Sequence, residues 1–215
     1  MVINHSGDWV AMASREEGQL FVWEWQSETY VLKQQGHFFD LNTVAYSPDG
    51  TIIATGGDDG KVKLWTVKNA LCFVTFSEHT DKITALQFTP RKGNAVLSAS
   101  ADGTVRAYDL VKYRNFRTMQ ANTPTQFSCL AIEQGGDIVA AGSLDPYDIY
   151  LWSLRTGQLL DVLSSHQGPV SSLSFSPPSA QANDTGSRLA SGSWDKTVKV
   201  WDIFGRQGLL ETLHH

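Results

Sequence analysis

Three segments of the sequence combine a histidine with a hydroxyl residue, an aspartate and an aromatic residue, and the last three recur at matching intervals. In each segment the hydroxyl residue lies four positions before the aspartate, and the aromatic residue lies six positions after it. Histidine, hydroxyl and aspartate are the groups of a hydrolase triad, in which histidine takes the proton of a nucleophilic hydroxyl. The three sets are His37, Thr55, Asp59 and Trp65; His79, Ser98, Asp102 and Tyr108; and His166, Ser191, Asp195 and Trp201.

Repetition of the set favours a structural role over catalysis, because a catalytic triad has no reason to occur three times at one interval. The residues resemble the repeated polar group of WD40 proteins. That resemblance implies a buried network in which the indole donates to the hydroxyl, the hydroxyl to histidine, and histidine to an aspartate that holds a tight turn. A complete network of this kind satisfies its buried polar groups and rigidifies the unit. We predict no catalytic residue and no enzymatic activity.

The aromatic residues of these sets belong to a longer series with a period of 40 to 45 residues. The intervals along the series are 42, 43, 44 and 49 residues, and the last is lengthened by the polar segment PPSAQANDTGS at 177–187. This period is typical of WD40 repeats, which form four-stranded propeller blades. The series consists of Trp23, Trp65, Tyr108, Trp152 and Trp201.

The second unit divides into four predicted strands. NTVAYS (42–47) and KVKLWTV (61–67) alternate with period two, TIIATGG (51–57) is nearly all apolar, and LCFVTF (71–76) follows as the fourth strand. Short strands at regular spacing with turns between them predict an all-β fold, and no segment has a helical stripe with caps.

We therefore predict one all-β domain over 1–215, a WD40 β-propeller of about five four-stranded blades. The abrupt first residues and the short first unit favour an incomplete arc of a larger, seven-bladed ring, in a piece of a longer chain. The predicted blades are 1–36, 37–78, 79–122, 123–165 and 166–215.

Two units depart from the pattern. The fourth has QANTPTQF where the others have histidine, and it has Ala141 four positions before Asp145. The first has Ala13 and Glu17 in place of the hydroxyl and the aspartate, so we expect no network there. In the third unit Tyr108 replaces tryptophan, which predicts an altered or water-bridged network.

Composition excludes several classes of function. The chain of 215 residues is 41 % hydrophobic and carries a net charge of −5, which argues against a globally basic nucleic-acid binder. Its two cysteines, Cys72 and Cys129, lie far apart and are expected to be reduced core thiols of an intracellular protein. No apolar run is long enough for a membrane span, and no metal-ligand spacing or phosphate-binding loop is present. We predict no metal, cofactor, membrane or small-molecule substrate.

Candidate binding residues lie in loops, because the strands of a propeller are committed to its core. Trp194 is expected in the loop between second and third strands, on a face where an exposed tryptophan would be an interface hot spot. Pro146 and Tyr147 interrupt the fourth unit by one residue and are expected to bulge outward. The alternative for each is ordinary loop packing.

A basic and aromatic segment, VKYRNFRT, is a candidate for RNA contact. Lys112, Arg114 and Arg117 would meet phosphates, and the aromatic residues between them would stack on bases. The alternative is a solvated outer strand, where lysine and arginine also discourage aggregation at the edge.

Several segments together resemble the periodic tryptophan protein 2 family over nearly the whole chain. The most specific are VWEWQSETYVLKQQGH (22–37) and VKYRNFRT (111–118), since neither is general propeller sequence. The resemblance implies part of a second propeller in a nucleolar scaffold of the small-subunit processome. The implied partners are other WD40 proteins, a small nucleolar ribonucleoprotein and pre-ribosomal RNA, and the implied function is support of small ribosomal subunit biogenesis.

Two other functions compete with that scaffold role. The propeller would be an adaptor or substrate receptor of another multiprotein complex, or it would contact RNA as its main task. Nucleolar location and association with large pre-ribosomal particles distinguish the scaffold from an adaptor. A salt-dependent RNA affinity that needs the basic segment distinguishes the RNA-binding propeller.

Overall fold

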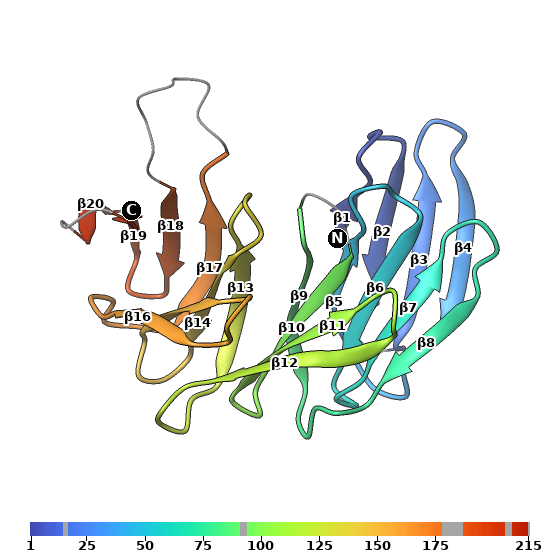
Figure 1. Ribbon diagram of the computed structural model, residues 1–215. Coiled ribbons are helices and arrows are strands. Elements are labelled where there is room, and N and C mark those ends of the chain that lie inside the picture. The colour runs from blue at the N-terminus through green and yellow to red at the C-terminus, as the bar shows by residue number, and fades with distance from the viewer. Residues whose placement is uncertain (15–16, 91–93, 178–186, 205–207, 215) are drawn as a thin grey trace.

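The computed structural model describes residues 1–14, 17–90, 94–177, 187–204 and 208–214, and Figure 1 draws these as coloured ribbon. The described residues form twenty strands and no helix. The strands make five four-stranded antiparallel sheets that follow one another around an arc (Figure 1). The molecule is a partial, unclosed β-propeller, and the prediction of an all-β propeller fold is confirmed.

Each sheet is built from four consecutive strands, ordered in space as in sequence. The first sheet contains β1 (Val2–Ile3), β2 (Trp9–Ala13), β3 (Gln19–Glu24) and β4 (Thr29–Gln35). The second contains β5 (Leu41–Tyr46), β6 (Ile52–Gly57), β7 (Val62–Thr66) and β8 (Cys72–Phe76). The third contains β9 (Ile83–Phe88), β10 (Ala95–Ser100), β11 (Thr104–Asp109) and β12 (Arg114–Gln120). The fourth contains β13 (Phe127–Ile132), β14 (Ile138–Ser143), β15 (Ile149–Ser153) and β16 (Leu159–Leu163). The fifth contains β17 (Val170–Phe175), β18 (Arg188–Ser193), β19 (Thr197–Asp202) and β20 (Leu209–His214).

The five aromatic residues of the repeat occupy equivalent places on the third strand of each sheet. Each lies opposite an apolar residue of the second strand, as Trp65 lies opposite Ile53 and Trp201 opposite Leu189. Residues from all five first strands line one central cavity, among them Ile3, Tyr46 and Phe88. The period in the sequence therefore corresponds to successive sheets around a common axis.

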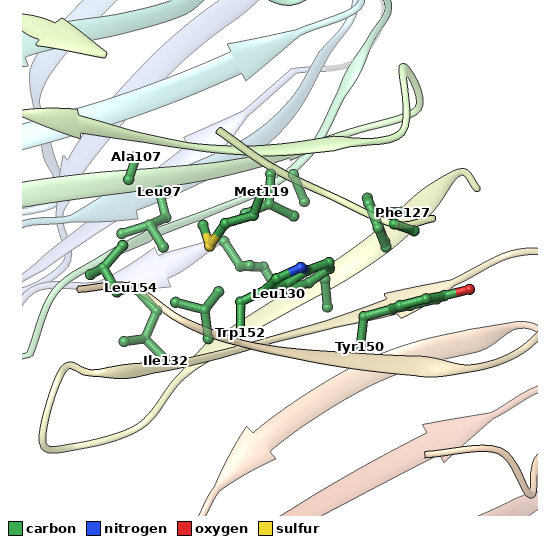
Figure 2. Packing of buried hydrophobic residues seen from close by; sticks show 14 residues of the cluster. Leu97, Ala107, Met119, Phe127, Leu130, Ile132, Tyr150, Trp152 and Leu154 are labelled. Atoms are coloured by element: carbon green, nitrogen blue, oxygen red, sulfur yellow. The ribbon is translucent and has the colours of Figure 1, made fainter. Parts of the chain in front are cut away.

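Apolar side chains on both faces of the inner strands hold neighbouring sheets together. β10 and β14 are buried along their whole length, because each sheet packs between two others and alternate side chains enter two different interfaces. Between the third and fourth sheets, Met119 and Leu97 meet Phe127 and Trp152 in one cluster (Figure 2). Burial of apolar area at such interfaces is the main stabilising contribution in this fold.

The register of the first sheet corrects one prediction. Trp23 lies opposite Val10, which puts Met12, and not Ala13, at the place of the network hydroxyl. The connection between β2 and β3 is one residue longer than that between β6 and β7, so counting back from Trp23 gives the wrong residue. Glu17 is exposed in this connection, while residues 15–16 lie outside the described part of the chain.

The loops that connect the strands lie on two opposite sides of the arc, one at each end of the strands. The loops between second and third strands, and those that lead from one sheet to the next, lie on one end, at the bottom of Figure 1. We call this the network end, since it carries the three predicted networks. The segment predicted as a long loop at 177–187 lies between β17 and β18 in the sequence, and its residues 178–186 lie outside the described residues.

Candidate partner-binding site

The second sheet brings all four residues of the first predicted set together. The Trp65 indole donates to Thr55 Oγ1 at 2.9 Å, and that hydroxyl lies 2.8 Å from His37 Nε2. His37 Nδ1 lies 2.9 Å from Asp59 Oδ1. Burial lowers the pKa of His37 and favours the neutral ring, which can accept from Thr55 at one nitrogen and donate to Asp59 from the other.

The fifth sheet repeats this chain of contacts. The Trp201 indole donates to Ser191 Oγ at 2.8 Å, and Ser191 Oγ lies 2.7 Å from His166 Nε2. His166 Nδ1 lies 2.8 Å from Asp195 Oδ2. The histidine bridges the loop that leads into the sheet and the loop between its second and third strands. Each complete network therefore fixes two loops of the network end to each other.

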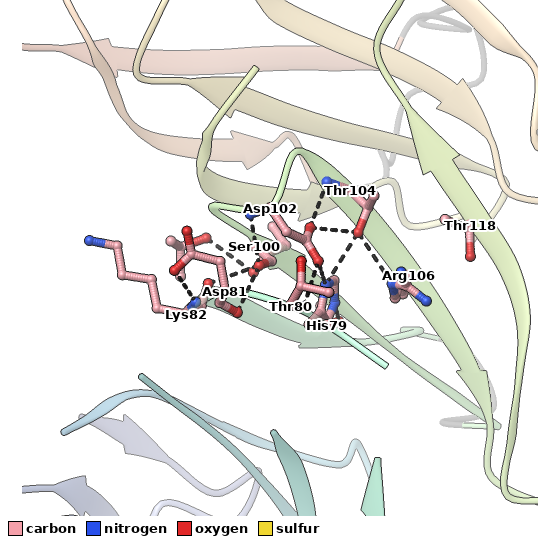
Figure 3. Close-up of polar contacts among 12 residues, drawn as sticks. His79, Thr80, Asp81, Lys82, Ser100, Asp102, Thr104, Arg106 and Thr118 are labelled. Atoms are coloured by element: carbon pink, nitrogen blue, oxygen red, sulfur yellow. Dashed lines mark hydrogen bonds and ion pairs between the residues drawn. The ribbon is translucent and has the colours of Figure 1, made fainter. Parts of the chain in front are cut away.

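The third sheet has an altered network. His79 Nε2 lies 2.6 Å from Ser98 Oγ. Its Nδ1 lies 2.8 Å from Asp102 Oδ2 (Figure 3). Tyr108 is buried and lies near Ser98, but no hydrogen bond of normal geometry joins its hydroxyl to a described residue. Its ring stacks on Phe76 with centroids 4.2 Å apart, and burial raises the pKa of the phenol.

Two threonines that the sequence reading overlooked belong to these networks. The Thr104 hydroxyl donates to Asp102 Oδ1 at 2.7 Å and lies 3.2 Å from His79 Nδ1 (Figure 3). Thr197 donates to Asp195 Oδ1 at 2.6 Å in the same way. The available signal was a threonine two residues after the aspartate in both sets, where the second sheet has Lys61.

Two network aspartates, Asp102 and Asp195, are stabilised as carboxylates. Burial alone raises the pKa of Asp102, but hydrogen bonds from His79 and Thr104 outweigh it and hold the pKa well below its usual range. For Asp195, burial likewise raises the pKa, and hydrogen bonds from Thr197 and the Gln167 amide lower it by more. The ionised form of each carboxylate is thus part of the folded loop structure.

We expect the free energy of unfolding to decrease on acidification. The pKa of His37 is lowered by folding, so below its ordinary value of 6.5 the unfolded chain binds a proton that the folded ring resists. Below about pH 4 the decrease becomes steeper, because Asp102 and Asp195 protonate more easily in the unfolded chain. Urea unfolding at fixed ionic strength between pH 8 and pH 3 measures this, and stability that stays level or rises on acidification would contradict it.

The fourth sheet replaces the polar network with aromatic packing. Ala141 is buried at the place of the hydroxyl, and Thr125 is the buried polar residue of the incoming loop. The Phe127 ring meets Tyr150 and Trp152 edge-on, at centroid distances of 5.7 and 5.6 Å. Tyr150 and Trp152 stack on each other, so the space is filled by rings instead of hydrogen-bonded groups.

The candidate partner-binding residues lie on loops of the network end. Trp194 is 72 % exposed, directly before the network residue Asp195. Pro146 is exposed and Tyr147 is half-buried in the loop between β14 and β15. The sequence reading overlooked Phe38 and Phe39, which are 91 % and 61 % exposed directly after His37. Two consecutive phenylalanines in a loop were the signal for this second aromatic site.

The three basic candidates for RNA contact do not form one exposed surface. Lys112 and Arg114 are exposed at the turn into β12. Arg117 is half-buried, and its guanidinium donates at 2.5 Å to the Arg155 carbonyl of the fourth sheet. Tyr113 meets Phe73 of the second sheet edge-on at 5.8 Å, so part of this segment serves contacts between blades.

Among the described residues, no group of three or more His, Cys, Asp or Glu side chains is arranged to hold a metal ion. The same part of the chain contains no helix long and apolar enough to cross a membrane. Cys72 and Cys129 are free, but only Cys129 is a core thiol; Cys72 is exposed on the outer strand β8, so the predicted core position is wrong for it. Burial raises the pKa of the Cys129 thiol to about 11. A thiol with that pKa is a poor nucleophile near neutral pH.

Comparison with known proteins places the chain among WD-repeat propellers. A family model described as the IFT122 first beta-propeller matches residues 1–215. The chain is 54 % identical over 214 residues to periodic tryptophan protein 2 homolog of Dictyostelium discoideum, covering 99 % of this chain and 22 % of that protein. It is 54 % identical over 211 residues to periodic tryptophan protein 2 of Saccharomyces cerevisiae, covering 98 % of this chain and 22 % of that protein. The chain belongs to this β-propeller family and to the periodic tryptophan protein 2 family of WD-repeat proteins.

The chain spans about a fifth of the length of the periodic tryptophan protein 2 relatives it matches. Identity of 49 % over 214 residues to the Arabidopsis thaliana protein extends the likeness to plants. The resemblance read from the sequence is therefore confirmed at the level of the periodic tryptophan protein 2 family. Its placement in the second propeller of such a protein stays a prediction, since the matched model describes the first propeller of a different protein.

Proposed function

We propose that the chain is a non-catalytic docking platform that supports small-subunit processome assembly and pre-ribosomal RNA processing in the nucleolus. Membership of the periodic tryptophan protein 2 family supports this function. The repeated histidine, hydroxyl and aspartate sets support a non-catalytic role, because their atoms are occupied in structural hydrogen bonds and their histidines and hydroxyl residues are buried.

One observation carries the docking function: exposed aromatic residues adjoin network residues in the chain. Phe38 follows His37, and Trp194 precedes Asp195. The networks hold the backbone on one side of each aromatic residue, so a partner that binds it does not have to order the loop. Large aromatic side chains that become buried on binding are the residues that contribute most to protein interfaces.

The proposed partners are other WD40 proteins of a processome subcomplex. In the proposed assembly, binding to these proteins brings the chain close to a small nucleolar ribonucleoprotein and to pre-ribosomal RNA. A net charge of −5 supports proteins over nucleic acid as the direct contacts. Lys112 and Arg114 are exposed at the turn into β12, which supports a local RNA contact as the second candidate function.

We expect Phe38→Ala combined with Trp194→Ala to reduce co-purification of partner proteins at least tenfold, because hot-spot residues contribute about 2 kcal/mol or more each. The change is made in the full-length parent protein, tagged and expressed in cells. The fold should be unaffected, since both side chains are exposed. Val111→Ala is the matched control, because Val111 is an exposed apolar residue in the turn between β11 and β12, on the side opposite the network end.

Location and particle size decide between the proposed functions. The parent should stain the nucleolus and sediment with large pre-ribosomal particles. A diffuse cytosolic protein would instead favour an adaptor of another complex. Partners that are released by ribonuclease, and lost on Lys112→Glu with Arg114→Glu, would favour RNA as the direct contact.

A further inference from the structure

A cavity of about 630 Å³ opens at the network end between the third and fourth sheets. Its walls come from three loops: the turn between β10 and β11, the loop that leads from β12 to β13, and the loop between β14 and β15. Gln120, Asn122, Gln126 and Asp145 contribute exposed side chains to the lining. No lysine or arginine is among the lining residues, so the cavity is polar and negatively charged.

Counted from the second strand, Asp145 occupies the position of the network aspartates of the other sheets, and the extra residue of its loop follows it. Each lies three residues after the glycine or alanine at the end of the ladder, as Asp145 follows Gly142 and Asp59 follows Gly56. The histidine that would bind it is missing. His37 and His166 lie four residues before the first residue of β5 and β17, and the corresponding residue before β13 is Thr123.

The Asp145 carboxylate is therefore uncommitted, in contrast with its equivalents. Asp102, on the opposite wall, accepts hydrogen bonds from His79, Thr104 and the Thr80 amide. No hydrogen bond from a described residue reaches the side chain of Asp145, which is exposed to solvent. The cavity thus combines one free carboxylate with a second carboxylate whose oxygens are already occupied.

The lining matches the guanidinium group better than other common ligands. A guanidinium is planar, always charged and carries five N–H donors, which pair with a carboxylate and with amide oxygens at the same time. Gln120, Asn122 and Gln126 offer side-chain amide oxygens around Asp145. Phosphate groups of RNA or phosphopeptides would meet like charge here, and an ammonium group has fewer donors to satisfy the amides.

We propose that this cavity binds an arginine side chain of a partner protein, with Asp145 as the pairing carboxylate. The inference rests on the proposed docking function and names the chemistry that one loop cluster recognises. The absence of a network in the fourth sheet then has a functional explanation. In three other sheets the aspartate binds a histidine and rigidifies the loops, whereas in the fourth sheet its carboxylate is left open for a ligand.

The test measures binding of short peptides to the immobilised 215-residue chain by surface plasmon resonance. The probe is acetyl-Gly-Arg-Gly-amide, and its comparators carry citrulline or lysine in place of arginine. Citrulline keeps the shape of arginine and removes its charge. We expect the arginine peptide to bind at least tenfold more tightly than the citrulline peptide and several-fold more tightly than the lysine peptide.

Two variants locate the site. Asp145→Asn should weaken binding of the arginine peptide about tenfold, to the level of the citrulline peptide, and should leave the melting temperature unchanged. Glu78→Gln removes one exposed carboxylate from another loop of the network end and should leave the affinity unchanged. Asn122→Ala combined with Gln126→Ala should weaken binding several-fold, which tests the amide walls separately from charge.

Equal binding of the arginine and citrulline peptides, or full binding by Asp145→Asn, would overturn the proposal. Lysine binding as tight as arginine binding would also overturn it, because the assignment depends on the fork of guanidinium donors. These failures are separate from failure of the docking function. Partner loss on substitution of Phe38 and Trp194 does not involve the cavity, so that result would still support docking if the peptides did not bind.

Discussion

Substitution of Asp102 by alanine is expected to lower the free energy of unfolding by about 3 kcal/mol, since removal of one member of a buried polar set leaves its partners unsatisfied. The carboxylate is almost fully buried and accepts four hydrogen bonds, from His79, the Thr80 amide and both the amide and hydroxyl of Thr104. Alanine would leave the His79 N–H and two backbone amides without an acceptor. For a chain of this length the melting temperature should fall by about 6–12 °C.

Asp145→Ala is the matched control for that substitution. It removes the same side chain from the equivalent loop of the fourth sheet, where no described residue donates to the carboxylate. Its effect should lie within about 0.5 kcal/mol, as for an ordinary surface substitution. Calorimetry or circular dichroism melting of both variants makes the comparison. Equal losses for the two would show that the loop position matters and the hydrogen bonds do not.

The architecture could be predicted from the sequence because each unit repeats the same local pattern. Alternating strands, turn residues and one aromatic residue per unit agree on one fold, and repetition multiplies a signal that is weak in a single unit. Three members of each polar set were equally accessible, since Thr55, Asp59 and Trp65 have counterparts at the same offsets in two other units. Spacing therefore identified the sets, and the resemblance to WD40 proteins predicted the contacts among their side chains.

Features that depend on loop length or on neighbouring sheets could not be predicted in the same way. One additional residue in the connection before β3 displaced the predicted hydroxyl position from Met12 to Ala13. The bond from Arg117 to the Arg155 carbonyl joins two sheets and leaves no trace in the spacing. Exposure of Phe38 depends on how its loop turns away from the network, and hydrophobic type alone predicts burial for such a residue.

Both terminal sheets present apolar faces that the inner sheets bury. On the fifth sheet, Val198 and Leu213 are 42 % and 49 % exposed, whereas their equivalents in the fourth sheet, Ile149 and Leu163, are buried against the fifth. On the first sheet, the face of Trp23 is likewise only half-buried, while the equivalent Trp65 is buried against the first sheet. The arc therefore ends in two complementary faces of the kind that join successive blades.

We expect the purified 215-residue chain to associate head to tail, with the first-sheet face of one copy against the fifth-sheet face of another. Such a contact is heterologous, so it produces oligomers of increasing size with concentration, unless the arcs close on themselves. Apolar burial at roughly 25 cal/mol per Å² favours this association over exposure of both faces. Sedimentation velocity between 1 and 100 µM measures the distribution of sizes.

Val198→Lys combined with Leu213→Lys should restore a monomer, because association would then bury two unpaired charges against an apolar face. Both side chains are exposed in the single chain, so the fold tolerates the change. Val111→Lys adds charge at an exposed turn away from both terminal faces and should leave association intact. If the unsubstituted 215-residue chain stays monodisperse at 100 µM, with a single cooperative melting transition, the two terminal faces must be buried within one molecule. The arc would then have to close in solution into a five-bladed ring, with the first sheet packed directly on the fifth.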